Sequence, residues 1–122
     1  MTVSEGDVGA FGELIGDIGD DLTAHHMPQD ALGFLPRKEG GCIIITTGEH
    51  VKTRTYGGKG ASTKVTDKGR PFADVLQDNI DDLKSITGDK YTKSIDNLID
   101  FYDEKGMLNK DEVAKLKAHN HH

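Results

Sequence analysis

Three histidines carry most of the chemical information in this chain. His25 and His26 are adjacent in Thr23-Ala24-His25-His26-Met27-Pro28, and His50 follows the apolar run Cys42-Ile43-Ile44-Ile45 by five residues. A neutral imidazole can bind a divalent metal ion or accept a proton from water. A histidine pair, a strand-like run and a third histidine therefore predict a small metal-dependent site that acts on phosphodiesters.

The two adjacent histidines cannot share one task. Neighbouring side chains of a strand point to opposite faces, so we expect one ring to hold a metal while the other reaches a water near Pro28. His50 begins a predicted helix, and Arg54 lies one turn later on the same face, placed for a scissile phosphate. The alternative is a polar surface strand, with His50 merely favouring a helix start.

The charge of the chain is unevenly distributed. Residues 1–36 carry seven acidic side chains and no Lys or Arg, residues 37–70 carry eight basic and three acidic ones, and residues 71–122 carry seven basic and eleven acidic ones. The three segments thus have charges of −7, +5 and −4, which sum to the net −6. A basic segment around His50 suits a phosphate-bearing substrate. A solvated, lysine-rich loop is the alternative.

Composition limits the fold and the partners. A chain of 122 residues with 34% hydrophobic content predicts one small domain, residues 1–118, with a lean core. We expect no membrane partner, because no apolar run of about 18 residues is present. The single cysteine, Cys42, excludes an internal disulfide, and we expect it in the core. We interpret residues 119–122 as a purification-tag remnant outside the site; a native metal-binding tail is the alternative.

The pattern of the first half predicts a mixed α+β fold. Apolar spacing from Val8 predicts a short helix that ends near Gly16 or Gly19. Strands are predicted over 22–27 and 42–46, which form a two-stranded hairpin over about residues 22–46. Thr47 is expected to cap a helix over 49–56.

The second half is predicted to be mainly helical. Residues 57–70 are expected to form a mobile, polar connection. Apolar residues after Pro71 recur at helical spacing on two faces, within 72–86 and 91–102. Asn109 and Glu112 have the spacing of a capping box for a last short helix.

Several segments together resemble a known family. Ala24-His25-His26-Met27-Pro28, Gly41-Cys42-Ile43-Ile44-Ile45 and Glu49-His50, preceded by an acidic helix, resemble the HNH/endonuclease VII superfamily. The likeness is to toxin nucleases with an Ala-His-His signature at the C-termini of polymorphic bacterial toxins, and it covers residues 8–56. It implies a ββα-metal (His-Me finger) core with a short N-terminal helix and C-terminal helices. One divalent ion (Mg, Mn, Ni or Zn) would serve cleavage of nucleic acid, with DNA favoured over RNA.

The resemblance also implies a role for each of the histidines. His25 and His50 correspond to metal ligands and His26 to the general base. Arg54 has no such counterpart, but its residue type suits stabilisation of transition-state charge. Residues of the basic segment would contact backbone phosphates: Arg37, Lys38, Lys52 and Lys59.

Two departures from the family pattern leave the ligand set open. No asparagine lies between His26 and His50, and Arg54 stands where some relatives have a second helical histidine. Water, the substrate phosphate or Glu49 could complete the metal site.

The resemblance further implies partners and a location. A bacterial secretion system would deliver the domain into the cytoplasm of a target cell, and a cognate immunity protein would neutralise it. The competing hypothesis is a non-enzymatic adaptor whose histidines bind a structural or regulatory metal.

Overall fold

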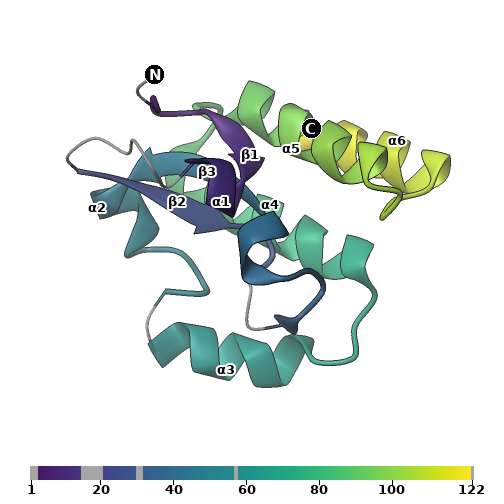
Figure 1. The fold of residues 1–122 in the computed structure, drawn as a ribbon, viewed down its shortest axis with the longest axis horizontal. Coiled ribbons are helices and arrows are strands. Elements are labelled where there is room, and N and C mark those ends of the chain that lie inside the picture. The colour runs from purple at the N-terminus through teal and green to yellow at the C-terminus, as the bar shows by residue number, and fades with distance from the viewer. Residues whose placement is uncertain (1–2, 15–20, 30–31, 57, 122) are drawn as a thin grey trace.

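The protein is a mixed α+β chain in which a small sheet is packed against helices (Figure 1). The computed structural model describes residues 3–14, 21–29, 32–56 and 58–121. The elements in chain order are β1 (Val8–Ala10), α1 (Phe11–Leu14), β2 (Leu22–His26), η3 (Arg37–Glu39), β3 (Gly41–Thr46), α2 (Thr47–His50), α3 (Gly58–Asp67), α4 (Phe72–Thr87), α5 (Thr92–Glu104) and α6 (Lys110–Asn120).

The sheet is antiparallel and has the strand order β1-β3-β2. The predicted hairpin over about residues 22–46 is confirmed, because β2 and β3 pair with His25 opposite Ile43 and His26 opposite Cys42. β1 adds a third strand on the other edge of β3, with Gly9 opposite Cys42. The central position of β3 explains why its side chains are apolar on both faces.

The two faces of β3 belong to two clusters. Ile43 and Ile45 are fully buried in the main core, whereas Cys42 and Ile44 are fully buried with Leu14 on the opposite face. Cys42 is therefore a core residue, as the sequence predicts. α4 and α5 supply most of the main core; their contributions are Leu76, Ile80, Leu83, Ile95, Leu98, Ile99 and Tyr102.

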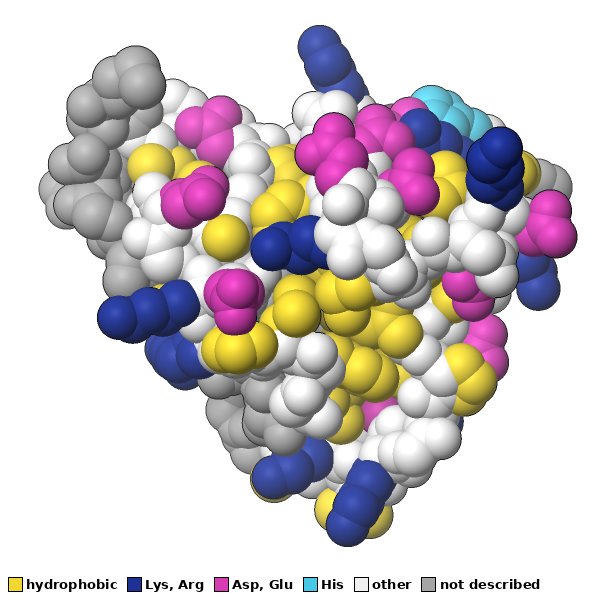
Figure 2. Space-filling model, turned by 45° about the vertical axis from the view of Figure 1, so that its right-hand side comes forward, with side chains coloured by type: hydrophobic (Ala, Val, Ile, Leu, Met, Phe, Trp, Pro, Cys, Tyr) yellow, Lys and Arg dark blue, Asp and Glu magenta, His cyan; other side chains and the backbone are white. Residues whose placement is uncertain are grey.

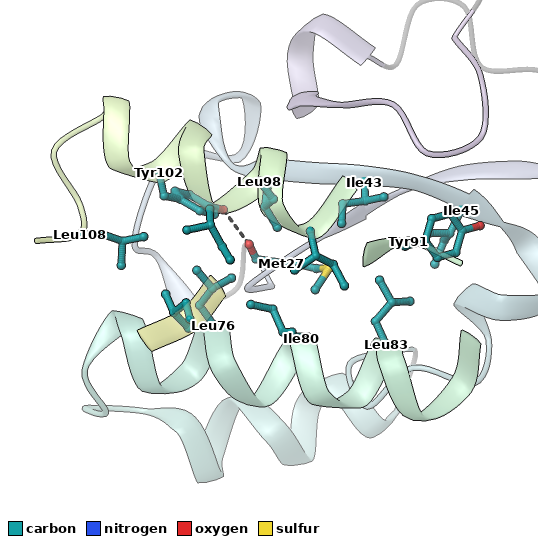
Figure 3. Close-up of a cluster of buried hydrophobic side chains, with 13 residues drawn as sticks. Met27, Ile43, Ile45, Leu76, Ile80, Leu83, Tyr91, Leu98, Tyr102 and Leu108 are labelled. Atoms are coloured by element: carbon teal, nitrogen blue, oxygen red, sulfur yellow. Dashed lines mark hydrogen bonds between the residues drawn. The ribbon is translucent and has the colours of Figure 1, made fainter. Parts of the chain in front are cut away.

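A buried tyrosine ties the helices to the sheet. The Tyr102 hydroxyl donates a hydrogen bond to the Met27 carbonyl at 2.7 Å (Figure 3). It also accepts one from the Gly41 amide at 2.9 Å. A phenol can be buried at low cost only when its hydroxyl has such partners. Tyr102 thereby holds the end of β2 and the start of β3 against α5, close to the histidine pair in sequence.

The first element differs from the prediction. Val8–Ala10 form strand β1 rather than the first turn of a helix, and the predicted helix begins only at Phe11, as α1. The Gly6 amide donates to the Ile44 carbonyl at 2.7 Å, and the Ile44 amide donates to the Asp7 carbonyl at 2.9 Å. These bonds to the central strand favour a strand over the helix that the apolar spacing predicts, because glycine is a poor helix former. The predicted helix end near Gly16 or Gly19 lies outside the described residues.

The helix after β3 is shorter than predicted. Thr46, rather than Thr47, is the N-cap, and Thr46 and Glu49 form a reciprocal capping box. α2 ends at His50, and residues 51–56 form turns. The β-branched residues Val51, Thr53 and Thr55 disfavour continuation of the helix.

The sequence predicts a mobile, polar connection over residues 57–70, whereas Gly58–Asp67 form helix α3. Gln29 donates to the Thr63 hydroxyl at 2.9 Å, and Asp67 pairs with Arg54 and Arg70. Distant partners therefore stabilise this helix. Figure 1 shows α3 below the sheet, apart from α5 and α6.

The C-terminal predictions are confirmed. α4 starts directly after Pro71, and Asn109 and Glu112 form the predicted capping box of α6. Asn120 is buried at the end of α6 and donates to the Thr92 carbonyl at 2.9 Å. This part of the tail is thus packed into the fold, and its origin as a tag stays a prediction. None of the described helices combines the length and apolar character needed to cross a membrane.

Candidate functional site

The fold brings His25 and His50 together. His25 is the fourth residue of β2 and is only 2% exposed, and His50 is the last residue of α2. α2 follows β3 directly, so the hairpin carries His50 back to β2, as the sequence predicts. The two imidazole centroids are 5.2 Å apart, with an interplanar angle of 65°.

Both imidazoles of this pair are neutral at pH 7. Burial lowers the pKa of His25 to about 3, with smaller contributions in the same direction from the neighbouring rings of His50 and His26. Burial also lowers the pKa of His50. Neither ring forms a hydrogen bond with another described side chain or carbonyl; their recorded contacts are between rings. The nitrogen lone pairs of His25 and His50 are therefore available to bind a ligand such as a metal ion.

His26 lies on the opposite face of the sheet. Its ring stacks on Phe11 at a centroid distance of 4.5 Å, and its Nε2 lies 3.1 Å from the Arg37 carbonyl oxygen. A carbonyl only accepts, so Nε2 carries the proton and Nδ1 is left as the acceptor of a neutral ring. A Cβ at Gly40 would lie 2.9 Å from His26 Cδ2, so the glycine makes room for this orientation.

Arg54 is engaged by acidic side chains. Its guanidinium binds both carboxylate oxygens of Asp67, at 2.8 and 3.2 Å, and its amide donates to Asp82 at 2.8 Å. Asp67 also accepts from Arg70 at 2.9 Å and is 1% exposed. Arg54 thus links the turns of residues 51–56 to α3 through an ion pair. The spacing of residues in the sequence could not predict this ion pair.

Glu49 is part of the support of α2. Its Oε1 accepts from the Thr46 amide at 2.9 Å and from the Tyr91 hydroxyl at 2.5 Å, and its Oε2 pairs with Lys90 at 2.7 Å. Burial alone would raise the pKa of Glu49, but the bonds from Lys90, Tyr91 and Thr46 outweigh it and lower the pKa to about 2. Both oxygens are thus engaged in bonds that hold α2, and with it His50, in position.

The basic side chains lie on several elements. Lys59 on α3 donates from Nζ to the Val51 carbonyl at 3.2 Å, which places its amine beside the end of α2. Lys38 and Lys52 are exposed, and the Arg37 guanidinium lies 4.7 Å from the Phe11 ring centroid. On the face in Figure 2, basic and acidic side chains are mixed around hydrophobic ones, so this face is not uniformly basic.

Two features of the site could not be predicted from spacing. Tyr56 packs edge-to-face on His50 with centroids 5.2 Å apart, and it is 42% exposed. Asp82 on α4 lies against residue 54, and burial raises its pKa. No sequence motif predicts that either residue lies at the site. Tyr56 reaches it through a turn, and Asp82 comes from a distant helix.

Among the residues that the structure describes, no three His, Cys, Asp or Glu side chains are grouped as metal ligands. The donors that the fold does bring together are the two neutral imidazoles. A divalent ion of the zinc or nickel type accepts such ligands, and water and substrate oxygens would have to fill the other positions.

Comparison with known proteins adds no family assignment. No family model matches the chain, and no curated protein or solved structure matches it significantly.

Proposed function

We propose that this chain is a metal-dependent endonuclease with a ββα-metal core formed by β2, β3 and α2. One observation carries the proposal: His25 and His50, from the first strand and the helix of this unit, lie with ring centroids 5.2 Å apart and lowered pKa values. The order of strand, strand and short helix matches what the resemblance implies.

The protonation of the pair favours metal binding over acid–base catalysis. Two histidines that work as an acid and a base need one protonated ring at the working pH. His25, with its pKa near 3, and His50, with a lowered pKa, both stay neutral at pH 7. A neutral imidazole is instead the form that binds a divalent ion. A bound ion would polarise the phosphate and stabilise the leaving oxygen.

His26 is the proposed general base. Its Nε2 donates to the Arg37 carbonyl, which fixes the ring and leaves Nδ1 to take a proton from water. The water oxygen then bonds to phosphorus, the bond to the 3′ oxygen breaks, and that oxygen takes a proton from solvent. Because His26 lies across β2 from the pair, the proposal requires substrate to reach the end of the strand beside Pro28.

Phosphate binding is assigned to the basic segment. Lys59 has the firmest support because its amine lies at the carbonyl of Val51, the residue that follows His50 in the chain. Lys52, Arg37 and Lys38 are proposed to contact the backbone further away. Arg54, proposed to stabilise transition-state charge, is held by Asp67, so its contribution requires the phosphate to approach this ion pair.

The biological setting proposed is that of an antibacterial toxin domain. It rests on the resemblance of Ala24–Pro28 and Glu49–His50 to secreted toxin nucleases. Delivery by a secretion system, action on DNA or RNA in the target cytoplasm, and a cognate immunity protein belong to the same proposal.

The competing function is a non-enzymatic adaptor that binds a regulatory metal through the same pair. Incubation of folded protein with plasmid and with single-stranded RNA, with magnesium, manganese, nickel, zinc or EDTA, discriminates the two. We expect cleavage with at least one metal, its loss in EDTA, and its loss in His25→Ala and His50→Ala. His119→Ala, which alters a histidine paired with Asp81 on α4, is the matched control and should cleave normally. Metal binding without cleavage of any substrate would support the adaptor.

A further inference from the structure

An exposed aromatic ring stands at the edge of the histidine pair. Tyr56 is 42% exposed, whereas Tyr91 and Tyr102 are 2% and 1% exposed. Its ring contacts His50, which contacts His25, with 5.2 Å between centroids at each step. The three rings thus lead from the buried interior at His25 to the surface at Tyr56.

The position of Tyr56 is set by the local backbone. The Tyr56 amide donates to the Thr53 carbonyl at 3.2 Å, and the Thr53 hydroxyl donates to the His50 carbonyl at 2.8 Å. Thr53 is fully buried. The turn from His50 to Tyr56 is therefore anchored at both ends, and the ring is held in place beside the pair.

The chain segment that carries the ring has an exposed apolar side chain and several basic ones. Val51 is 39% exposed, and Lys59 bonds its carbonyl at 3.2 Å. Residues 50–59 include Lys52, Arg54 and Lys59. Arg54 is paired with the Asp67 carboxylate, so the cations offered to a phosphate are Lys52 and Lys59, which are both exposed. An aromatic face beside such cations is the combination that proteins use to bind the base and the phosphate of an unpaired nucleotide.

We propose that Tyr56 is the surface on which a nucleobase next to the scissile phosphate stacks, and that the substrate is single-stranded or locally unpaired nucleic acid. The inference rests on the proposed nuclease function and names its substrate class. In a duplex, neighbouring bases cover each other's faces and only edges are open in the grooves. A ring can stack on a base only after the base has left the duplex. Stacking accepts every base, so cleavage has little sequence preference.

The experiment measures binding without cleavage, in EDTA, with fluorescently labelled oligonucleotides. The probes are a single strand, the same strand with its complement, and the same strand with abasic sites. We expect Tyr56→Leu to weaken single-strand binding about 5- to 150-fold, the range for one base stacked on an aromatic ring. Tyr56→Phe keeps the ring and should bind within about 3-fold of the wild type. Duplex binding should be the same for all three proteins.

Two readouts on the wild type need no variant. Abasic sites should lower affinity as much as Tyr56→Leu does. The single strand should also quench tyrosine fluorescence, since the protein has no Trp and its other two tyrosines are buried. Equal affinity of Tyr56→Leu and wild type for the single strand, with both proteins folded by circular dichroism, would overturn the inference.

Failure of the inference is distinguishable from failure of the proposed function. Suppose that cleavage depends on metal and on His25 but is equally fast on single strand and duplex and unchanged in Tyr56→Leu. That result rejects the stacking role and supports the nuclease function. Single-strand binding that depends on Tyr56, without cleavage under any metal, supports the stacking role and rejects the nuclease.

Discussion

At the scale of the residue, burial decides what each histidine can do. His25 is 2% exposed and its pKa falls to about 3, whereas His26, its neighbour in the chain, stacks on Phe11 at the opposite face. The alternation of a strand separates the two rings, and this separation could be predicted from the sequence. The degree of burial could not, because it depends on the helices that cover the His25 face.

The burial of His25 predicts acid sensitivity. Its unfolded pKa is about 6.5, so below that pH the unfolded chain binds a proton that the folded chain excludes until about pH 3. Stability should fall as pH drops through this window, by about 2 kcal/mol between pH 7.5 and 5. Urea unfolding at these pH values measures this loss of stability. Both pH values lie above the range in which most carboxylates titrate, so His25 can be observed separately from them. His50 acts in the same direction, since its pKa is also lowered.

The variant His25→Gln separates this effect from the rest of the chain. It should be less stable than wild type at pH 7.5, where neutral His25 packs well, yet lose less stability on acidification. A slope with pH identical to that of wild type would contradict a buried neutral His25.

The three histidines should differ in the kind of defect that their loss causes. His26→Ala should keep metal affinity and reduce the cleavage rate by roughly 10²–10⁴-fold, the scale of general-base removal. His25→Ala and His50→Ala should weaken metal affinity first, so that excess metal partly restores cleavage. Calorimetric metal titration beside single-turnover cleavage separates the two kinds. If His26→Ala loses metal binding while His25→Ala cuts normally, the two roles are exchanged.

At the scale of the element, α2 depends on its surroundings. An isolated helix of the four residues Thr47–His50 is unstable. Its N-terminus is held by the Thr46–Glu49 capping box, and Glu49 is held in turn by Tyr91 and Lys90 at the start of α5. The capping box, and through it the position of His50, therefore depends on a contact between residues 42 positions apart in the chain.

The two capping boxes of the protein offer a matched test. Thr46→Ala and Asn109→Ala each remove an N-cap and should each cost about 1 kcal/mol of stability. Only Thr46→Ala should weaken metal binding and cleavage, because α2 carries His50 and α6 carries no site residue. Thermal unfolding and metal titration of both variants check this. Equal metal affinity in the two variants would mean that His50 does not need the cap.

Elements with local signals could be predicted, and those with distant partners could not. β2, β3, α4, α5 and α6 follow from alternation, β-branched runs, periodicity and a capping box. β1 and α3 do not, since they depend on bonds to Ile44 and on ion pairs of Asp67. The same limit applies to the site. The proximity of His25 and His50 could be predicted from the sequence. The pairing of Arg54 with Asp67 could not, because no sequence pattern connects these two positions.

At the scale of the whole molecule, a net charge of −6 opposes binding to a polyanion. Affinity must then come from local cations, and the basic segment 37–70 supplies a net +5 within an acidic chain. Electrostatic attraction of this kind is short in range and is screened by salt, with a screening length of about 8 Å at physiological ionic strength.

This charge arrangement predicts a modest salt dependence of nucleic-acid binding. If Arg37, Lys38, Lys52 and Lys59 contact phosphates, the slope of log affinity against log salt for a single strand should be about −3. Lys59→Ala should reduce the magnitude of that slope by about 0.7, because one phosphate contact is lost. Lys115→Ala removes an exposed charge from α6, far along the chain from the site, and should leave the slope unchanged. Fluorescence anisotropy in EDTA, from about 50 to 200 mM salt, measures all three proteins. Equal slopes for Lys59→Ala and wild type would show that no phosphate contacts the Lys59 amine at the end of α2, and the basic segment would then be a solvated surface.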